Sequence, residues 1–380
     1  MDQSFYTDRE QTAVKHRILE RYLSAFVPIV GAWAADISYI DCLAGPWQSM
    51  DPQFRDTSFG TAIDVLRATA RVLSDRARYP RMRCLFVERD ASAFAKLSKF
   101  CESVRDIHVV PKNWDFVQHV SDVVNFVKDE SDSFPFIFID PKGWEQLDAK
   151  VIAPILRLNP GEVLVTFMTS WIVRFLSVPE KRFDRIFGSD LPRLVQLRGE
   201  EQEEELVKCY SDLIRRAGNY KFVCSLPVMK PSQDAFHFHM IYGTRHVRGV
   251  EVFKETEKSV VPFMHETRAM AQHRRRFENS GQFSLLGPDA EYKEKRFTQF
   301  RQRKLAAAKK HLEDILMASK EVLYDDAWAT AMQYPTIMEE DLGDWLKEWK
   351  QRGLLEITNQ AAGRKLARKG QKQFLRWRKS

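Results

Sequence analysis

An apolar run that stops abruptly at an acidic residue constrains this chain more than any other stretch. Phe136-Ile137-Phe138-Ile139 is rich in β-branched and aromatic residues and predicts a buried strand of a parallel sheet. Asp140-Pro141 ends that strand and leaves a carboxylate at its carboxyl end. Ligands of open α/β sheets bind at this edge. The sequence therefore predicts an α/β fold with a candidate site at Asp140.

The same pattern of a strand followed by an acid recurs three times before Asp140. Asp41 closes a strand at 38–40, Glu88 closes a strand at 83–87, and Asp115 follows a strand at 108–110. Helical periodicity predicts helices between these strands, at 8–27, 60–75, 91–103 and 117–128. A fifth strand at 161–168, a mostly helical stretch at 171–215, and strands at 220–228 and 236–242 complete the pattern. It predicts a doubly wound, Rossmann-like sheet with one antiparallel strand, an arrangement that resembles the class I methyltransferase sheet.

Near residue 285 the alternation of strands and helices gives way to charged, mostly helical segments. This change predicts two domains, 1–285 and 286–380. We expect a charged helix at 290–319 and a short helix at 324–334. A third helix is expected to begin with a capping box, in which the Thr336 hydroxyl caps the first turn and Glu339 reaches back. A strand at 354–358 and a basic turn follow. This order predicts a helical linker and a winged-helix domain with a basic tail. A plain helical bundle is the alternative.

The net charge of +7 is unevenly distributed. The tail at 361–380 carries eight basic residues and no acid, and a second cluster lies at 273–276. Such clusters suit phosphate backbones, although solvated helical faces have the same composition. The residues expected to contact nucleic acid are Arg274, Arg275, Arg276, Arg364, Lys365, Arg368 and Lys369. The helix at 339–348 is acidic, which suits a protein-docking face better than a phosphate-lined groove.

Several classes of protein fit the composition poorly. No apolar run approaches the length of a membrane helix, and the N-terminus lacks a signal-peptide pattern, so we expect no membrane contact and a cytoplasmic location. The five cysteines form no CxxC pair, which argues against a metal site. His237 and His239 share a strand face, but no acid or cysteine clearly completes a ligand set.

The four strand-end acids suit a nucleoside cofactor, here S-adenosyl-L-methionine. Asp41 and the turn at Ala44-Gly45 suit its amino-acid moiety, Glu88 can accept both ribose hydroxyls, and Asp115 suits the adenine amino group. Each acid alone also has a local explanation as a strand terminator or a helix cap. A G-x-G-x-x-G motif and a P-loop are both absent from the sequence, which argues against nicotinamide and nucleoside triphosphate sites.

The segment Asp140-Pro141-Lys142-Gly143-Trp144 is similar to the Asn/Asp-Pro-Pro-aromatic motif of amino-methyltransferases. That likeness implies that the Asp140 side chain and the carbonyl of Pro141 accept hydrogen bonds from a target amine. Trp144 would stack on the base. Lys142 replaces the second proline and is expected to act at the site or to contact a phosphate or the cofactor carboxylate. We therefore expect amino-methylation of a nucleic-acid base.

Larger parts of the chain resemble the three-Cys-motif partner protein (TcmP) family. The residues that carry this resemblance are 41–46, 138–144, Lys15-His16, Tyr22-Leu23, 86–88, Arg174 and 242–249. The resemblance implies a methyltransferase-like fold and a three-Cys-motif protein as partner. It leaves open a non-catalytic partner module in a two-protein system of a phage or mobile element. Gly45-Pro46-Trp47 departs from the family's Gly-Pro-Gly turn, and Trp47 would either crowd or cover the cofactor.

Overall fold

The chain divides into two compact units. One comprises residues 1–223 and 227–292, and the other comprises 293–380 together with 224–226. The structure, a computed structural model, describes residues 3–45, 49–178, 182–281, 294–359 and 367–378.

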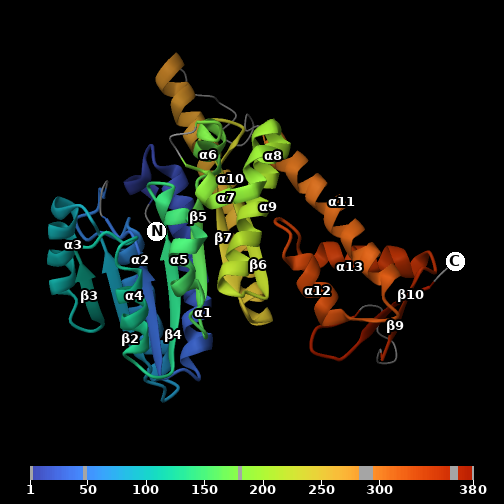
Figure 1. Ribbon diagram of the computed structural model, residues 1–380, viewed down its shortest axis with the longest axis horizontal. Coiled ribbons are helices and arrows are strands. Elements are labelled where there is room, and N and C mark those ends of the chain that lie inside the picture. Colours follow the sequence, from blue (N-terminus) through green and yellow to red (C-terminus); the bar gives the residue numbers. More distant parts are fainter. Residues whose placement is uncertain (1–2, 46–48, 179–181, 282–293, 360–366, 379–380) are drawn as a thin grey trace. The chain divides into compact units, whose positions relative to one another are not determined.

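The first unit is built on a seven-stranded sheet with the order β3-β2-β1-β4-β5-β7-β6 (Figure 1). Its strands are β1 (Asp36–Asp41), β2 (Arg81–Val87), β3 (His108–Lys112), β4 (Ser133–Ile139), β5 (Glu162–Phe167), β6 (Phe222–Met229) and β7 (Phe236–Thr244). Strands β1 to β5 pair in parallel, and β7 pairs with β5 antiparallel. The predicted α/β class, with a mostly parallel sheet and an antiparallel strand, is confirmed.

Helices alternate with the strands and cover both faces of the sheet (Figure 1). They are α1 (Glu10–Gly31), α2 (Ser58–Ser74), α3 (Ala91–Ser103), α4 (Val120–Lys128), α5 (Ala149–Leu156), α6 (Thr169–Phe175), α7 (Asp184–Phe187), α8 (Leu191–Gln196), α9 (Gly199–Gly218) and α10 (Val247–Ser280). Short 3-10 turns occupy Gln3–Tyr6, Glu145–Leu147 and Gly188–Asp190. The predicted helix at 91–103 matches α3, and α1 extends to Gly31 where the prediction ended at 27.

Successive residues of the central strands enter different cores, which explains why these strands are apolar throughout. Phe136 of β4 stacks on Tyr22 of α1 with ring centroids 5.2 Å apart. The next residue, Ile137, packs instead into the core that contains Val123 of α4 and Ile152 of α5. Alternate residues of a strand point to opposite faces, so a strand covered on both faces needs apolar side chains at every position.

The strand order reverses beside β1, because β1 pairs with both β2 and β4. Asp41 is level with Phe86 of β2 and Phe138 of β4. Glu88 and Asp140 each lie two residues beyond those positions, so their backbone lies about 7 Å farther along the strands than that of Asp41. The carboxyl edge at this reversal is the crevice where open α/β sheets bind ligands.

The second unit combines three helices with a three-stranded antiparallel sheet. Its elements are α11 (Lys295–Ala318), β8 (Val322–Leu323), α12 (Tyr324–Met332), α13 (Glu339–Gln351), β9 (Leu355–Thr358) and β10 (Phe374–Trp377). Strand β10 lies between β8 and β9. Leu342, Trp345 and Trp349 of α13 are buried and belong to the core of this unit.

The predicted capping box at Thr336 and Glu339 is wrong. Thr336 adopts a φ of 65°, so the chain turns there, and α13 begins at Glu339. The carboxylate that reaches back is that of Asp341, which accepts a hydrogen bond from the backbone N–H of Met338 at 2.8 Å. The N-cap is therefore Met338, two residues later than the sequence pattern indicated.

Candidate functional site

Asp41 is the deepest of the four strand-end acids. It is fully buried and accepts hydrogen bonds from Ser58 Oγ at 2.5 Å and from the backbone N–H of Leu43 at 3.2 Å. Burial raises its pKa to about 7; these two hydrogen bonds and Lys15 oppose the rise, and Asp140 adds to it. Asp41 is therefore a carboxyl group that changes charge near neutral pH.

Asp140 forms an ion pair with Lys15 Nζ of α1, which sequence reasoning did not pair with it. The exposed fractions of the two side chains are 13% for Lys15 and 27% for Asp140, so the pair is largely withdrawn from water. The acceptor expected to receive a substrate amine thus already holds an ammonium group. A substrate amine must replace Lys15 or share the carboxylate with it.

Glu88 and Lys142 lie close enough to interact. Glu88 is buried, and its Oε1 accepts a hydrogen bond from the backbone N–H of Asp90 at 2.7 Å. Partial withdrawal from water lowers the pKa of Lys142 to about 8, while the carboxylates of Glu88, Asp140 and Asp90 oppose that shift. The Lys142 ammonium therefore interacts with both the acid that ends β2 and the acid that ends β4.

The carboxylate of Asp115 contacts groups close to it in the fold. It accepts a hydrogen bond from the backbone N–H of Val117 at 3.1 Å and pairs with Arg89 Nη1 at 3.3 Å. Beside it, the ring of Trp114 stacks on His119 with centroids 4.7 Å apart. Asp115 closes the turn between β3 and α4, which is the local role that a strand-end aspartate often has.

The segment after β1 continues the sheet's hydrogen bonding. The backbone N–H of Ala44 donates to the carbonyl of Val87 at 2.8 Å, and Gly45 follows directly. Farther along, buried Asp56 accepts hydrogen bonds from Arg9 at 2.7 Å and from Ser49 Oγ at 2.5 Å, which ties the start of α1 to this segment. Pro46 and Trp47, on which the fit of a cofactor was expected to depend, lie outside the described residues.

A cavity of about 320 Å³ adjoins Asp140 at the carboxyl edge. Its wall is formed by the start of α1, the segment after β4, the end of β5, α6 and the start of β7. The residues that line it are Gln11, Thr12, Lys15, Asp140–Gly143, Leu147, Thr166, Met168, Trp171, His237 and Phe238. It combines a flat aromatic wall with several polar groups, as small-molecule sites do.

The tryptophan that lines this cavity is Trp171 of α6. Trp144, which was expected to stack on a base, packs instead against the core on the α4–α5 side, with the guanidinium of Arg185 5.8 Å from its ring centroid. Among the described residues around the cavity, Trp171 and Phe238 supply the rings. A tryptophan at the start of the helix after β5 is a weak sequence signal, because it is also typical of a core residue.

Because β7 runs antiparallel to β5, its start and not its end lies at the carboxyl edge of the sheet. His237 is near the start of β7 and lines the cavity, with its Nδ1 3.3 Å from Ser170 Oγ. Burial lowers the pKa of His237, and Lys230 and Lys15 lower it further. His246 follows the other end of β7, where its Nδ1 accepts a hydrogen bond from the backbone N–H of Arg248. His246 is therefore absent from the lining of this cavity.

No group of three or more histidine, cysteine, aspartate or glutamate residues could hold a metal ion within the part of the chain that the structure describes. Over the same residues, no helix is long and apolar enough to cross a membrane.

The basic cluster at 274–276 is partly used for structure. Arg274 forms ion pairs with Asp8 at 3.1 Å and with Glu10, and so ties the end of α10 to the start of α1. Arg275 is half-buried and Arg276 is exposed. A nucleic-acid role for Arg274 would require it to leave two carboxylates.

In the second unit, Lys369 Nζ lies 3.9 Å from the ring centroid of Trp328. Arg368 is exposed, with its backbone N–H donating to Gln373. Arg364 and Lys365 lie outside the described residues. Arg368 and Lys369 are therefore the expected tail contacts that can be located.

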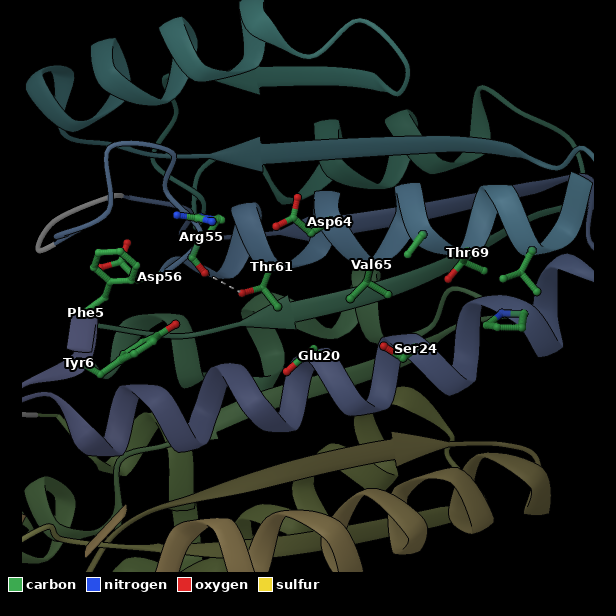
Figure 2. A pocket seen from close by; sticks show the side chains of 13 residues that line it. Phe5, Tyr6, Glu20, Ser24, Arg55, Asp56, Thr61, Asp64, Val65 and Thr69 are labelled. Carbon is green, nitrogen blue, oxygen red and sulfur yellow. Dashed lines mark hydrogen bonds between the residues drawn. The ribbon is translucent and has the colours of Figure 1, made fainter. Parts of the chain in front are cut away.

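A larger cavity, of about 500 Å³, lies between α1 and α2 (Figure 2). Tyr6, Arg55 and Asp56 lie at one end of it, and Thr69 lies toward the other. The described residues that line it include none of the four strand-end acids. Size alone therefore does not identify the candidate site.

Comparison with known proteins leaves the family open. No protein-family model and no curated protein matches the chain. Among solved structures, protein LPL1258 from Legionella pneumophila, of the DUF519 family, covers 64% of this chain and 88% of its own length at 13% identity and a TM-score of 0.37. A loganic acid methyltransferase with SAH covers 73% and 91%, at 10% identity and a TM-score of 0.31. These values do not establish a shared family or activity.

Proposed function

We propose that this chain has a class I methyltransferase fold, binds S-adenosyl-L-methionine at the carboxyl edge of its sheet, and methylates an amine. The observation that carries the proposal is the meeting of Asp41, Glu88 and Asp140 at the reversal of strand order. In an open α/β sheet this is the position of the ligand. The resemblance to the TcmP family is part of the same proposal.

The described residues fit such a cofactor in charge and in donor type. Glu88, buried at the end of β2, offers two carboxylate oxygens for two vicinal hydroxyls. Asp41, with a pKa near neutrality, can take a negative charge opposite an ammonium group. Asp115 and Trp114 would meet the adenine. The cofactor would supply an electrophilic methyl group, to which the amine nitrogen bonds as the carbon–sulfur bond breaks and the amine loses a proton.

The chain's own contribution is mainly positioning. Asp140 would accept a hydrogen bond from the target amine and hold its nitrogen in line with the methyl group, an orientation effect that can lower a barrier substantially. Trp171 would lie against a flat substrate. Lys15 would shift from Asp140 when the amine arrives.

Calorimetry with S-adenosyl-L-methionine tests cofactor binding directly. Glu88→Gln should weaken binding about 10- to 100-fold, because hydrogen bonds to a charged acceptor are lost. Glu145→Gln, at an exposed acid beyond β4, is the matched control and should change nothing. Absence of binding by the unaltered chain at millimolar cofactor would contradict the proposal.

Asp140→Ala separates catalysis from cofactor binding. It should abolish methyl transfer from labelled cofactor and leave cofactor affinity nearly unchanged. A parallel loss of both would assign Asp140 to cofactor binding and remove its role toward the amine.

A base in nucleic acid remains the proposed substrate. The order of three helices and a small antiparallel sheet in the second unit supports a winged helix, with Arg368 as an exposed basic residue. Because β10 is the middle strand of that sheet, deleting the tail would destroy the sheet, so charge substitutions are the better test. Arg368→Gln with Lys372→Gln should flatten the salt dependence of binding to nucleic acid, whereas Lys320→Gln should not.

A non-catalytic partner module, working with a three-Cys-motif protein, is the second candidate. The ion pair between Lys15 and Asp140 favours it, because the presumed amine acceptor is already satisfied. Lys15→Met distinguishes the two. An enzyme should change its KM or turnover when Lys15 no longer competes for Asp140, and a binding module should show no methyl transfer with either form.

A further inference from the structure

A cavity with aromatic walls lies at the opposite edge of the same sheet. It has a volume of about 230 Å³ and is lined by the second half of α1, the first residues of β4 and β5, and the start of α10. The parallel strands begin here, so the cavity is far along the strands from Asp140. The proposed methyl transfer does not use it.

A buried carboxylate forms the polar end of this cavity. Glu162, the first residue of β5, has only 5% of its surface exposed. Tyr22 Oη donates to Glu162 Oε2 at 2.5 Å, and Thr244 Oγ1 donates to Oε1 at 2.8 Å. Gly249 lets α10 pack closely against Glu162, because a Cβ at that position would lie only 2.6 Å from Glu162 Oε1. The Tyr242 hydroxyl also hydrogen-bonds this carboxylate, which has about four acceptor positions and can therefore accept one further donor.

The charge of Glu162 is incompletely balanced. Burial raises its pKa, and the hydroxyls and Arg245 only oppose that shift. The Arg245 guanidinium is itself bound to backbone carbonyls, at 2.9 Å from Leu158 and 3.0 Å from Gly161. A cation in the cavity would therefore stabilise the ionised carboxylate.

The walls of the cavity are aromatic. Phe134 lies between Phe26 and Trp33, with ring centroids 5.4 Å and 5.7 Å away, and Tyr22 stacks on Phe26. Trp33 is 59% exposed, so it forms the rim. Aromatic faces attract organic cations and also pack against their apolar parts.

The positive charge at the rim is already paired. Arg248 lines the cavity, and its guanidinium is held by Glu251 on the same helix. His246 uses Nδ1 to accept the Arg248 backbone N–H. Neither arrangement places an unbalanced cation against the deep carboxylate.

We propose that this cavity is a second binding site, specific for a small primary ammonium ion with an apolar body. The ammonium group donates to Glu162, and the apolar body packs against Phe26, Phe134 and Trp33. The site is separate from the proposed methyl-transfer site, and its existence does not depend on that function.

The test uses the full chain labelled with 5-fluorotryptophan and 2-phenylethylamine as the probe. The ¹⁹F resonance of Trp33, identified by its loss in Trp33→Phe, should shift saturably. The uncharged control 2-phenylethanol should bind at least about tenfold more weakly, because it lacks the charge that Glu162 attracts. Equal affinities, or no shift at about 10 mM amine, would overturn the proposal.

Two variants test whether the amine binds through Glu162. Glu162→Gln keeps the shape and removes the charge, so it should reduce the amine's affinity to that of the alcohol. Glu20→Gln, on the same helix but facing the cavity of Figure 2, should leave the affinity unchanged. If Glu162→Gln does not fold, calorimetry on Trp33→Ala decides, since Trp33 is 59% exposed and its truncation removes little buried surface. A loss of about threefold or more supports the site, and unchanged affinity refutes it.

Discussion

Replacing Asp41 by asparagine should change how the stability of the fold depends on pH. Asp41 is fully buried, and burial raises the pKa of its carboxyl group to about 7 from an ordinary value of 3.8. Asparagine has nearly the same shape, keeps an oxygen to accept from Ser58 Oγ or the Leu43 N–H, and does not titrate.

The sign follows from proton linkage. Below the pKa of the unfolded chain both states are protonated, and the contribution of Asp41 to stability is fully present. As the pH rises toward 7 the unfolded chain releases its proton first, so stability is lost, and the loss is complete above the folded pKa. A shift of about three units at 1.36 kcal/mol per unit amounts to about 4 kcal/mol.

Urea denaturation of both proteins from about pH 4 to about pH 8 measures this difference. The free energy of unfolding of the unaltered chain, relative to Asp41→Asn, should fall by about 4 kcal/mol over that range. Asp106→Asn is a control, because Arg67 lowers the pKa of that exposed carboxyl and its titration ends below neutral pH. A flat difference between the unaltered chain and Asp41→Asn would refute the argument that burial dominates the ionisation of Asp41.

Two further predictions concern packing. Asp36→Ala should destabilise the first unit by about 3–5 kcal/mol, because it leaves the buried guanidinium of Arg83 without the carboxylate that it contacts at 2.8 Å. Asp106→Ala, at an exposed pair, should cost less than about 1 kcal/mol, and thermal denaturation of both variants measures the difference. Gly249→Ala should cost about 1–3 kcal/mol, because the added Cβ would lie 2.6 Å from Glu162; an unchanged melting temperature would contradict that close approach.

The strand-end acids illustrate what a pattern along the chain can predict. A run such as Phe136–Ile139 is stable only where both faces are covered, so it identifies a buried strand from local composition. The carboxyl ends of parallel strands lie at one edge, so Asp41, Glu88 and Asp140 are brought to that edge by chain direction alone. No knowledge of packing is needed for that inference.

The ion pair of Lys15 illustrates what local patterns cannot predict. Lys15 and Asp140 are 125 residues apart, and their contact depends on where α1 crosses the sheet. The choice of Trp171 instead of Trp144 as the ring in the cavity likewise depends on which helix turns toward it.

The basic residues divide in the same way. Their clustering was visible in the sequence, but the engagement of Arg274 with Asp8 and Glu10 depends on the packing of α10 against α1. Composition measures how much charge a segment carries. It does not measure how much of that charge is already neutralised by partners from elsewhere.

The sequence by itself determined the class of sheet, the order of its elements and the edge at which its acids meet, because apolar periodicity and chain direction are local properties. The tertiary structure decided which groups share each site. It paired Lys15 with Asp140, and through the antiparallel direction of β7 it placed His237 and not His246 at the carboxyl edge. It also enclosed Glu162 among aromatic rings, because only packing brings together side chains that are distant along the chain.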